Sequence, residues 1–390
     1  MSEIKDIPKH WEKKKLGEVC GIVYGKGLPV KELKPSGFPV FGANGIIGFN
    51  DKYLFEEPQV LISCRGAASG KINLSPPKCY VTNNSLVLDI KQKNELDKTY
   101  LFYALNIANK TKLVTGTAQP QVTINNAVEL DICYPPLPEQ QAIVAKIEEL
   151  LSELENGKQQ LLTGQQQLKV YRQSLLKWAF EGLKEEKTVE EISEEHSIGL
   201  VKSSKEQNEI GTGLPYIKMN NVDLDGNVDF KKVVYVETTN EEARKYSLRK
   251  GDILINTRNS VELVGKTGIV REEKPNCVFN NNLLRVRTKK NYNSLFIGYQ
   301  LISPWLRKQM TKEKKSTTNV CALYQRDIFP LRVKVTTLPE QQRIVDELES
   351  KLTVCDKIEE TISKSLQQAE TLRQSILKKA FEGKLININS

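Results

Sequence analysis

The sequence predicts an α+β protein made of two similar globular domains and two long helices that pair as an intramolecular antiparallel coiled coil. Residues 137–182 recur without a gap at 338–383, and 20 of these 46 positions are identical. Both stretches carry apolar residues in a heptad pattern, and the segments before them share several short motifs. A period near 200 residues is too long for a solenoid repeat. We therefore interpret the chain as a duplicated unit with pseudo-twofold symmetry.

The duplication divides the 390 residues into four segments, which is consistent with a chain of multidomain length. We expect globular domains at 1–138 and 184–338. We expect helical segments at 139–183 and 339–390.

Each globular segment mixes strand and helix patterns. Short apolar runs flanked by Gly and Asn predict buried strands at 59–63, 85–90 and 251–256. Helical patterns occur near 99–108 and 294–308. Because the copies differ here in length and in most side chains, we expect the two domains to bind different ligands.

The long helices have recognisable ends. Both open with Leu-Pro-Glu-Gln-Gln, and Glu139 and Glu340 suit the positive end of the helix dipole. Both close with Ala-Phe-Glu-Gly, so we expect Gly182 and Gly383 to form left-handed caps. The predicted seam of the first helix, repeated 201 residues later, is Ile143, Ile147, Leu150, Leu154, Gly157, Leu161, Gly164, Leu168, Tyr171, Leu175 and Trp178.

The formal charge of +9 is unevenly distributed along the chain. Residues 1–138 carry +4 and residues 183–339 carry +7, whereas both helical repeats are slightly acidic. A basic surplus confined to the globular segments indicates that these segments meet a polyanion such as DNA. Ordinary surface lysine is the alternative explanation.

The sequence gives no sign of catalysis by this chain. The Asn/Asp-Pro-Pro-Tyr/Phe motif of amino-methyltransferases does not occur in it. Gly265-Lys266-Thr267 ends like a phosphate-binding loop, but Ser260 occupies the position of the first glycine. His10 and His196 are the only histidines and have no evident acid-base partner in the sequence.

Cysteine usage and hydropathy limit the class of protein further. The seven cysteines are scattered and contain no Cys-x-x-Cys pair, so we expect neither disulfides nor a zinc site. No apolar run approaches the about 18 residues of a membrane span. These features predict a cytoplasmic protein without a metal.

The order and motifs of the segments resemble the specificity subunit of type I restriction-modification enzymes. Leu-Pro-Glu-Gln-Gln and Lys-x-Ala-Phe-Glu-Gly bound both helices, and residues 38–48 and 251–258 are similar to segments of that family's target recognition domains. The resemblance implies a non-catalytic, sequence-specific DNA-binding subunit. Each recognition domain would read one half of an asymmetric bipartite site, and the helices would set the spacer.

The same resemblance implies the partners and cofactors. Two modification subunits of the adenine-N6 methyltransferase class would dock on the chain, together with motor-nuclease restriction subunits. S-adenosylmethionine would bind the modification subunit, and ATP and Mg would bind the motor subunit, so this chain would hold no cofactor. Two alternatives stay open: a specificity subunit for a fused methyltransferase-nuclease of the type IIB or IIG kind, and a duplicated scaffold that binds only protein.

Candidate DNA-contacting residues follow from position and chemistry. Arg65 and Arg258 follow equivalent strands, and arginine is the commonest reader of guanine in the major groove. Lys71 and Lys266 follow glycines in equivalent loops, where phosphate contact is expected. The remaining candidates lie in polar segments before the last strand of each domain, and they are Lys110, Lys112, Gln119, Gln121, Lys312, Lys314, Lys315 and Asn319.

Overall fold

The computed structural model describes residues 7–111, 113–116, 120–274, 276–311 and 321–386. The chain forms two compact units. The first unit comprises residues 1–162 and 363–390, and the second comprises residues 163–362. Each unit therefore contains one globular segment and parts of both long helices.

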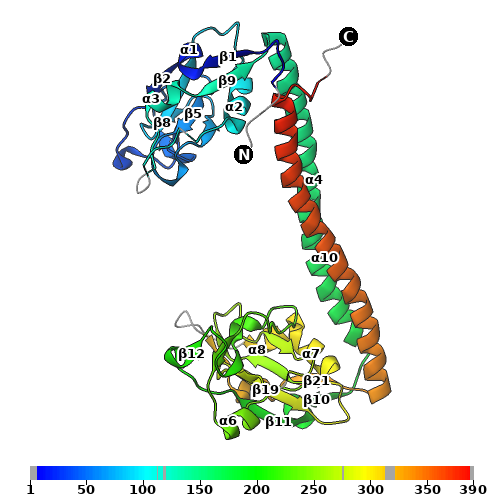
Figure 1. Cartoon of the computed structure of the whole chain (residues 1–390). Coiled ribbons are helices and arrows are strands. Elements are labelled where there is room, and N and C mark those ends of the chain that lie inside the picture. The colour runs from blue at the N-terminus through cyan, green and yellow to red at the C-terminus, as the bar shows by residue number, and fades with distance from the viewer. Residues whose placement is uncertain (1–6, 112, 117–119, 275, 312–320, 387–390) are drawn as a thin grey trace. The chain divides into compact units, whose positions relative to one another are not determined.

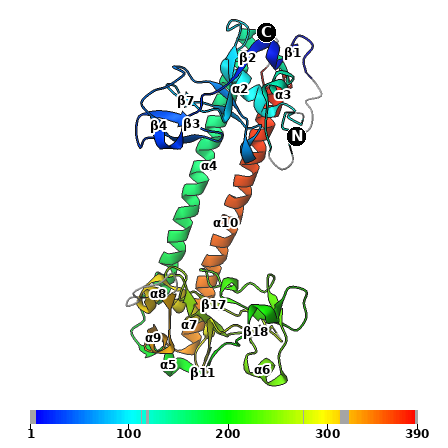
Figure 2. The same cartoon turned by 90° about the vertical axis from the view of Figure 1, so that its left-hand side faces the viewer.

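The described residues of the first globular segment form three small sheets and short helices. Its main sheet is antiparallel, with the order β2 (Cys20–Tyr24), β8 (Ser85–Ile90), β5 (Val60–Ser63) and β6 (Ile72–Leu74). The second sheet, visible in Figure 2, has the order β4 (Ile46–Asn50), β3 (Phe38–Phe41) and β7 (Tyr80–Val81). The other elements are β1 (Glu12–Lys15), which pairs with β9 (Asp131–Tyr134), and α1 (Leu16–Val19), η1 (Val30–Glu32), η2 (Gly66–Ala68), α2 (Lys98–Ile107) and α3 (Ile124–Val128).

The second globular segment repeats this plan. Its main sheet has the order β11 (Ser193–Ile198), β19 (Leu283–Thr288), β15 (Ile253–Asn256) and β17 (Thr267–Ile269). The next sheet has the order β12 (Gln207–Asn208), β14 (Val234–Val236), β13 (Leu214–Ile217) and β18 (Val278–Phe279). The paired strands β10 (Glu186–Thr188) with β21 (Arg332–Lys334), and β16 (Arg258–Asn259) with β20 (Cys321–Ala322), complete the strands.

The helices of this segment match those of the first only in part. They are α5 (Val189–Ile192), η3 (Ser204–Glu206), η4 (Met219–Asn221), α6 (Asn240–Lys245), α7 (Ser294–Ile302), α8 (Pro304–Thr311) and α9 (Gln325–Ile328). The helix predicted at 294–308 is thus two helices. They separate at Ser303-Pro304 because proline disfavours helical geometry in the residue before it.

The predicted strands are confirmed, and their burial explains why they form. Every residue of β5 and of β15 is buried, and each strand lies between two neighbours in its sheet. The β-branched side chains of these strands fill the core on one face of each sheet, and Leu61 and Leu254 fill a smaller core on the other face. β5 and β15 are therefore held rigidly, and they fix the position of the residues that directly follow them.

The two long helices are α4 (Leu137–Phe180) and α10 (Leu338–Phe381), which begin two residues and one residue, respectively, before the predicted segments. Figure 1 shows them side by side. In the first unit, Ile143 and Ile147 of α4 share a core with Leu377 of α10. In the second unit, Leu175 near the end of α4 shares a core with Leu348 near the start of α10. The helices are therefore antiparallel, as predicted.

The predicted seam is only half correct. One row of α10, seven residues apart, is buried throughout: Leu348, Cys355, Ile362, Ala369 and Ile376. The other row is displaced by one residue, and Tyr171, Trp178 and Leu372 are about half exposed. The buried row keeps a strict seven-residue spacing, so the prediction differs from the structure only in which residue of each heptad lies beside that row, and Arg172 is less exposed than Tyr171.

A polar contact occupies the displaced row. Arg172, one residue beyond the predicted seam position, donates to Asp356 at 2.6 Å and to Glu359 at 3.0 Å. Its side chain is only 15% exposed, so the guanidinium lies in the helix interface of the second unit. An ion pair between two helices favours the axial register in which its partners meet.

The two helix caps also differ. Gly383 has φ of +68°, so the left-handed cap predicted there is confirmed. The same prediction was wrong for Gly182, which does not adopt a positive φ. After α4 the chain leads into β10, and Leu183 packs against the core of the second unit. Within the described ranges, no helix has the length and apolar character that crossing a membrane requires.

Candidate nucleic-acid interface

The end of the central strand is built in the same way in both domains. In the first domain the amide of Val122 donates to the carbonyl of Cys64 at 3.0 Å, and Arg65 pairs with Gln121 in an antiparallel bridge. In the second domain the amide of Leu323 donates to the carbonyl of Thr257 at 2.8 Å, and Arg258 pairs with Ala322. The backbone at each arginine is thus held by the strand before it and by a later segment of the chain that pairs with it.

Arg65 and Arg258 are both exposed at these strand ends. Among the described residues, neither guanidinium has an ion-pair partner or a side-chain hydrogen bond. Gln121, also exposed, is brought beside Arg65 by the backbone bridge. Two of the residues predicted from sequence therefore form one patch, although 55 residues separate them along the chain.

The two equivalent lysines have different environments. Lys71 is exposed, and its ammonium donates to the side chain of Asn44 at 2.6 Å. Lys266 is only 8% exposed and donates to the backbone carbonyls of Met219 at 3.1 Å and Val222 at 2.6 Å. Burial, aided by nearby Arg307, lowers the pKa of Lys266. This ammonium is committed to the loop around η4, so we leave Lys266 out of the proposed contact set.

The other predicted residues are only partly described. Lys110 follows α2 and is half-buried, and burial lowers the pKa of its ammonium. The rest of this group lie outside the described residues, namely Lys112, Gln119, Lys312, Lys314, Lys315 and Asn319.

A turn within the 38–48 motif completes the patch of the first domain, although the sequence did not predict its contacts. Residues 42–45 join β3 to β4, and three side chains hold them. Ser85 Oγ donates to the carbonyl of Gly42 at 2.9 Å, Ser63 Oγ donates to the carbonyl of Ala43, and Lys71 donates to Asn44. The motif at 38–48 marked this segment, but only the fold shows that Asn44 lies beside Lys71. We call Arg65, Gln121, Lys71 and this turn the first reading patch.

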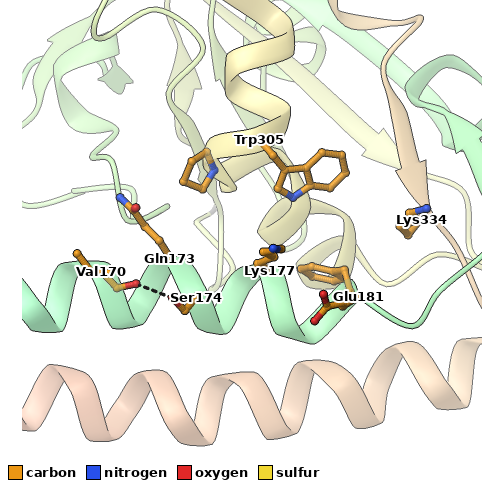
Figure 3. A pocket seen from close by; sticks show the side chains of 9 residues that line it. Val170, Gln173, Ser174, Lys177, Glu181, Trp305 and Lys334 are labelled. Atoms are coloured by element: carbon orange, nitrogen blue, oxygen red, sulfur yellow. Dashed lines mark hydrogen bonds between the residues drawn. The ribbon is translucent and has the colours of Figure 1, made fainter.

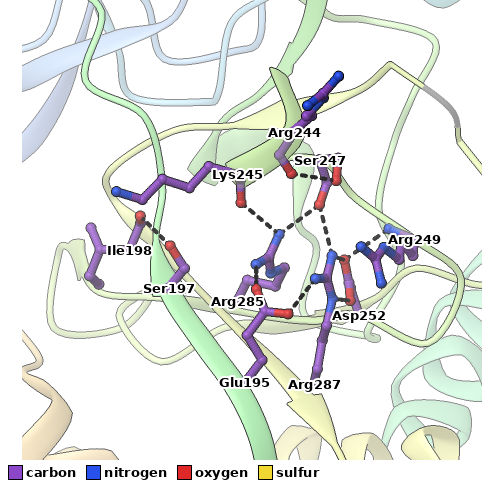
Figure 4. Close-up of polar contacts among 10 residues, drawn as sticks. All are labelled: Glu195, Ser197, Ile198, Arg244, Lys245, Ser247, Arg249, Asp252, Arg285 and Arg287. Carbon is purple, nitrogen blue, oxygen red and sulfur yellow. Dashed lines mark hydrogen bonds and ion pairs between the residues drawn. The ribbon is translucent and has the colours of Figure 1, made fainter. Parts of the chain in front are cut away.

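Not every arginine of the second domain is available for a ligand. Arg285 on β19 is fully buried, and it donates to the carbonyl of Ser247 at 2.6 Å and to Glu195 (Figure 4). Arg287 donates to Asp252 at 2.7 Å and to Glu195 at 2.6 Å. Burial lowers the pKa of Arg285, whereas for Arg287 the bonds to these two carboxylates outweigh burial and raise the pKa.

The first glutamine after Glu in each helix opening is a buried clamp, which the sequence did not reveal. Gln140 donates to the carbonyls of Glu95 at 2.7 Å and Pro135 at 2.8 Å, and accepts from the amide of Asp97 at 2.8 Å. Gln341 makes the same three contacts with Asn291, Thr336 and Asn293. Asp97 and Asn293 cap α2 and α7, so each clamp fixes a domain helix to a long helix.

The last phenylalanine of each long helix packs in the globular domain from which that helix did not start. Phe381 lies 5.2 Å from the ring of Tyr100 on α2, and Phe180 lies 5.3 Å from the ring of Phe296 on α7. Each core therefore contains the start of one long helix and the end of the other. This exchange explains why both end motifs repeat.

A groove of about 510 Å³ lies in the second unit, on the face of α4 that points away from α10 (Figure 3). Val170, Lys177 and Phe180 of α4 form one side, and Trp305 of α8 forms the other. In the first unit a cavity of about 1040 Å³ is lined by Phe381, the residue equivalent to Phe180.

The chain is similar to known proteins over both halves. A family model described as "Type I restriction modification DNA specificity domain" matches residues 8–163 and 183–368. The type I restriction enzyme EcoKI specificity subunit of Escherichia coli (strain K12) is 30% identical over 272 residues, which are 66% of this chain and 58% of that protein. The match thus spans less than two thirds of that relative.

Two further comparisons extend the likeness. The type I restriction enzyme EcoBI specificity subunit of Escherichia coli is 26% identical over 334 residues, covering 75% of this chain and 67% of that protein. A chain from a solved structure of a type I R-M system matches with a TM-score of 0.74 and 21% identity, covering 97% of this chain and 99% of that chain. This second likeness concerns the fold alone.

Proposed function

The chain belongs to the type I restriction-modification DNA specificity family, and on this premise we propose that it is the DNA-reading subunit of such a complex. Each globular domain reads one half of a bipartite site, and the chain itself catalyses no reaction. The observation that carries this proposal is the duplicated exposed arginine: Arg65 and Arg258 leave equivalent buried strands, and each is held by a returning segment. Rigid placement of arginine suits bidentate contact with guanine.

The differences between the domains support an asymmetric site. The first reading patch adds an exposed lysine and the turn around Asn44 to its arginine. In the second domain the equivalent lysine is buried. Base contacts specify sequence, whereas phosphate contacts only position the protein. Because the two domains present different side chains on a similar backbone, their half-sites should differ in sequence.

The long helices are proposed to set the spacer between the half-sites, because both domains share them. Each domain is fixed to one helix by a glutamine clamp and to the other helix by a phenylalanine. A change in helix length would therefore alter spacing without altering either reading patch. Inserting about four residues, roughly 6 Å of helix, would change the spacer by a base pair or two.

Exposed apolar side chains on the helices are the proposed docking points for two modification subunits, one on each unit. Tyr171 of α4 is 52% exposed in the second unit, and its counterpart Leu372 of α10 is 51% exposed in the first. The groove beside Trp305 adds apolar surface next to the Tyr171 side of the second unit. In this proposal S-adenosylmethionine binds the modification subunits, and ATP and Mg bind the motor-nuclease subunits.

The decisive experiment is methylome sequencing of cells with and without this gene, together with the gene for the modification subunit. We expect adenine methylation at one split, asymmetric site that is lost when this gene is deleted. Exchanging residues 1–136 for those of a relative should change one half-site and preserve the other half and the spacer. A swap that altered both half-sites would show that the domains do not read independently, and methyl transfer by the purified chain alone would contradict the non-catalytic role.

Stoichiometry tests the docking points. Tyr171→Ser and Leu372→Ser should each remove one modification subunit from the complex, as measured by native mass spectrometry. Val354→Ser is the matched control, because Val354 is 55% exposed on α10 but its counterpart in α4 is Glu153. Retention of both modification subunits by both variants would place docking elsewhere.

A further inference from the structure

Two isoleucines at the start of β4 are exposed beside the first reading patch. Ile46 is 56% exposed and Ile47 is 50% exposed. They follow directly after the turn that contains Asn44, whose side chain accepts a hydrogen bond from Lys71. Apolar side chains are thus presented next to positive charge.

The local backbone explains this exposure. β4 pairs with β3, but the register shifts between Val40 and Phe41, so that Phe41 faces Ile46 while Val40 faces Gly48. Ile47 is therefore the extra residue of a β-bulge, a feature that redirects side chains and is frequent beside active sites. The three hydrogen bonds that hold residues 42–44 to β5, β8 and Lys71 make the turn a fixed platform.

We propose that Ile46 and Ile47 read A·T base pairs in the half-site of the first domain by contacting thymine methyl groups in the major groove. This inference rests on the proposed function. β4 is an edge strand of its three-stranded sheet, so within the described residues the side of β4 away from β3 has no neighbouring strand in that sheet. The major groove admits β-strands, and the thymine C5-methyl is the apolar group that it displays. The exposed Lys71 and Arg65 nearby supply the contacts to phosphate or guanine that hold β4 there.

This readout is specific to the first domain. In the second domain, β13 leads into η4, and Met219 packs against a core. Val261 and Leu263, exposed apolar residues that closely follow Arg258 in the sequence, lie instead in the loop between β16 and β17. Loss of Ile46 and Ile47 should therefore affect one half-site only.

The test uses the assembled modification complex and DNA in which uracil replaces thymine throughout one half-site. This exchange removes the methyl group and keeps the hydrogen-bonding pattern. The wild-type complex should bind the uracil half-site of the first domain about fourfold more weakly for each methyl that it contacts. The variant Ile46→Ala/Ile47→Ala should bind the thymine and uracil DNA equally, and uracil in the other half-site should affect both complexes alike.

Two variants keep the test interpretable. Ile46→Ala alone should reduce the preference for thymine over uracil to half or less. The side chain of Ile47 should stay next to Gly42 in this variant. Val30→Ala, at an apolar residue of the same domain that is 81% exposed, should keep the full preference. Three outcomes would overturn the inference while specific binding stands. The wild-type complex could bind uracil and thymine DNA equally, or the half-site of the first domain could contain no thymine. The double variant could also keep the preference for thymine over uracil. Absence of any specific binding would refute the proposed function instead.

Discussion

Lys71 and Lys266 follow glycines in the same hairpin of two copies of one domain, but only Lys71 is exposed. In the first domain residues 42–59 connect β3 to β5, whereas in the second domain residues 218–252 connect β13 to β15. The longer connection forms η4 and supplies the carbonyls of Met219 and Val222 to Lys266. The longer connection thus makes Lys266 part of the fold, whereas the shorter one leaves Lys71 at the surface.

The main sheets show the same contrast. Val87 on β8 is buried among apolar residues, and the equivalent position on β19 is Arg285, also fully buried. Glu195 faces Arg287 across the strands, where the first domain has Gly21 facing Asp89. One backbone accommodates both an apolar sheet face and an ion network. Residues at equivalent positions of the two domains can therefore have different roles. Each predicted contact has to be judged in its own domain.

The largest expected effect tests what the two domains share. Phe180→Ala should destabilise the second unit, and Phe381→Ala the first, each by about 3–5 kcal/mol, because a buried aromatic ring is lost. Hydrogen exchange measured by mass spectrometry would report faster exchange in α7 for Phe180→Ala and in α2 for Phe381→Ala. Leu372→Ala, at a half-exposed position of α10, is the control and should change neither. Faster exchange in the unit where each helix starts would contradict the exchanged packing.

The next effect tests the ion network that only the second domain has. Arg285→Val introduces the residue of the first domain. It removes the bonds from Arg285 to the carbonyls of Ser247 and Lys245, and it leaves both Ser247 and Glu195 with Arg287 alone as their arginine donor. We expect the second unit to lose about 3 kcal/mol of unfolding free energy. Denaturant unfolding followed in each unit would show this loss. An unchanged second unit would mean that the network contributes no net stability.

The sequence predicted the architecture better than the site, for physical reasons. The duplication, the central strands and the antiparallel helices follow from periodicity and apolar runs, which depend on neighbouring residues. The clamp of Gln140 depends on carbonyls up to 45 residues away, and the bridge of Arg65 to Gln121 depends on a returning segment. No local pattern encodes such contacts.

Lys266 shows the limit most clearly. Its glycine, its lysine and its position after the strand match those around Lys71, so the sequence treats the two as equals. Burial of Lys266 is decided by the distant residues 219–222. The exposed half of the predicted seam has a related reason, because the pattern of α4 alone does not show that Arg172 meets Asp356 and Glu359 of α10.

A smaller effect tests whether the two arginines read separate half-sites. Arg65→Ala should relax specificity only in the half-site of the first domain, and Arg258→Ala only in the other. Each should cost about 1–3 kcal/mol of binding to the intact site. Binding selection on randomised half-sites measures both quantities. Lys93→Ala is the control, because Lys93 follows the opposite end of β8 from Ser85 and should leave specificity unchanged. Relaxation of both half-sites by one variant would contradict independent reading.

The smallest effect separates the two lysines. Lys71→Met should weaken DNA binding by about 1 kcal/mol and reduce its salt dependence by about one ion, with no change in stability. Lys266→Met should leave DNA binding unchanged and lower stability by about 1–2 kcal/mol, because two buried carbonyls lose their donor. Weaker DNA binding by Lys266→Met in a folded complex would return this residue to the contact set.

The pH dependence of the unfolding free energy is an independent test of the burial of Lys266. Burial lowers the pKa of Lys266 in the folded chain below the value of about 10.4 in the unfolded chain. Between these two pKa values the unfolded chain binds more protons, so the free energy of unfolding rises with pH across that window. The stability difference between wild type and Lys266→Met should therefore grow as pH approaches about 10.4. A difference that is constant with pH would show that the ammonium is as well solvated in the fold as in water.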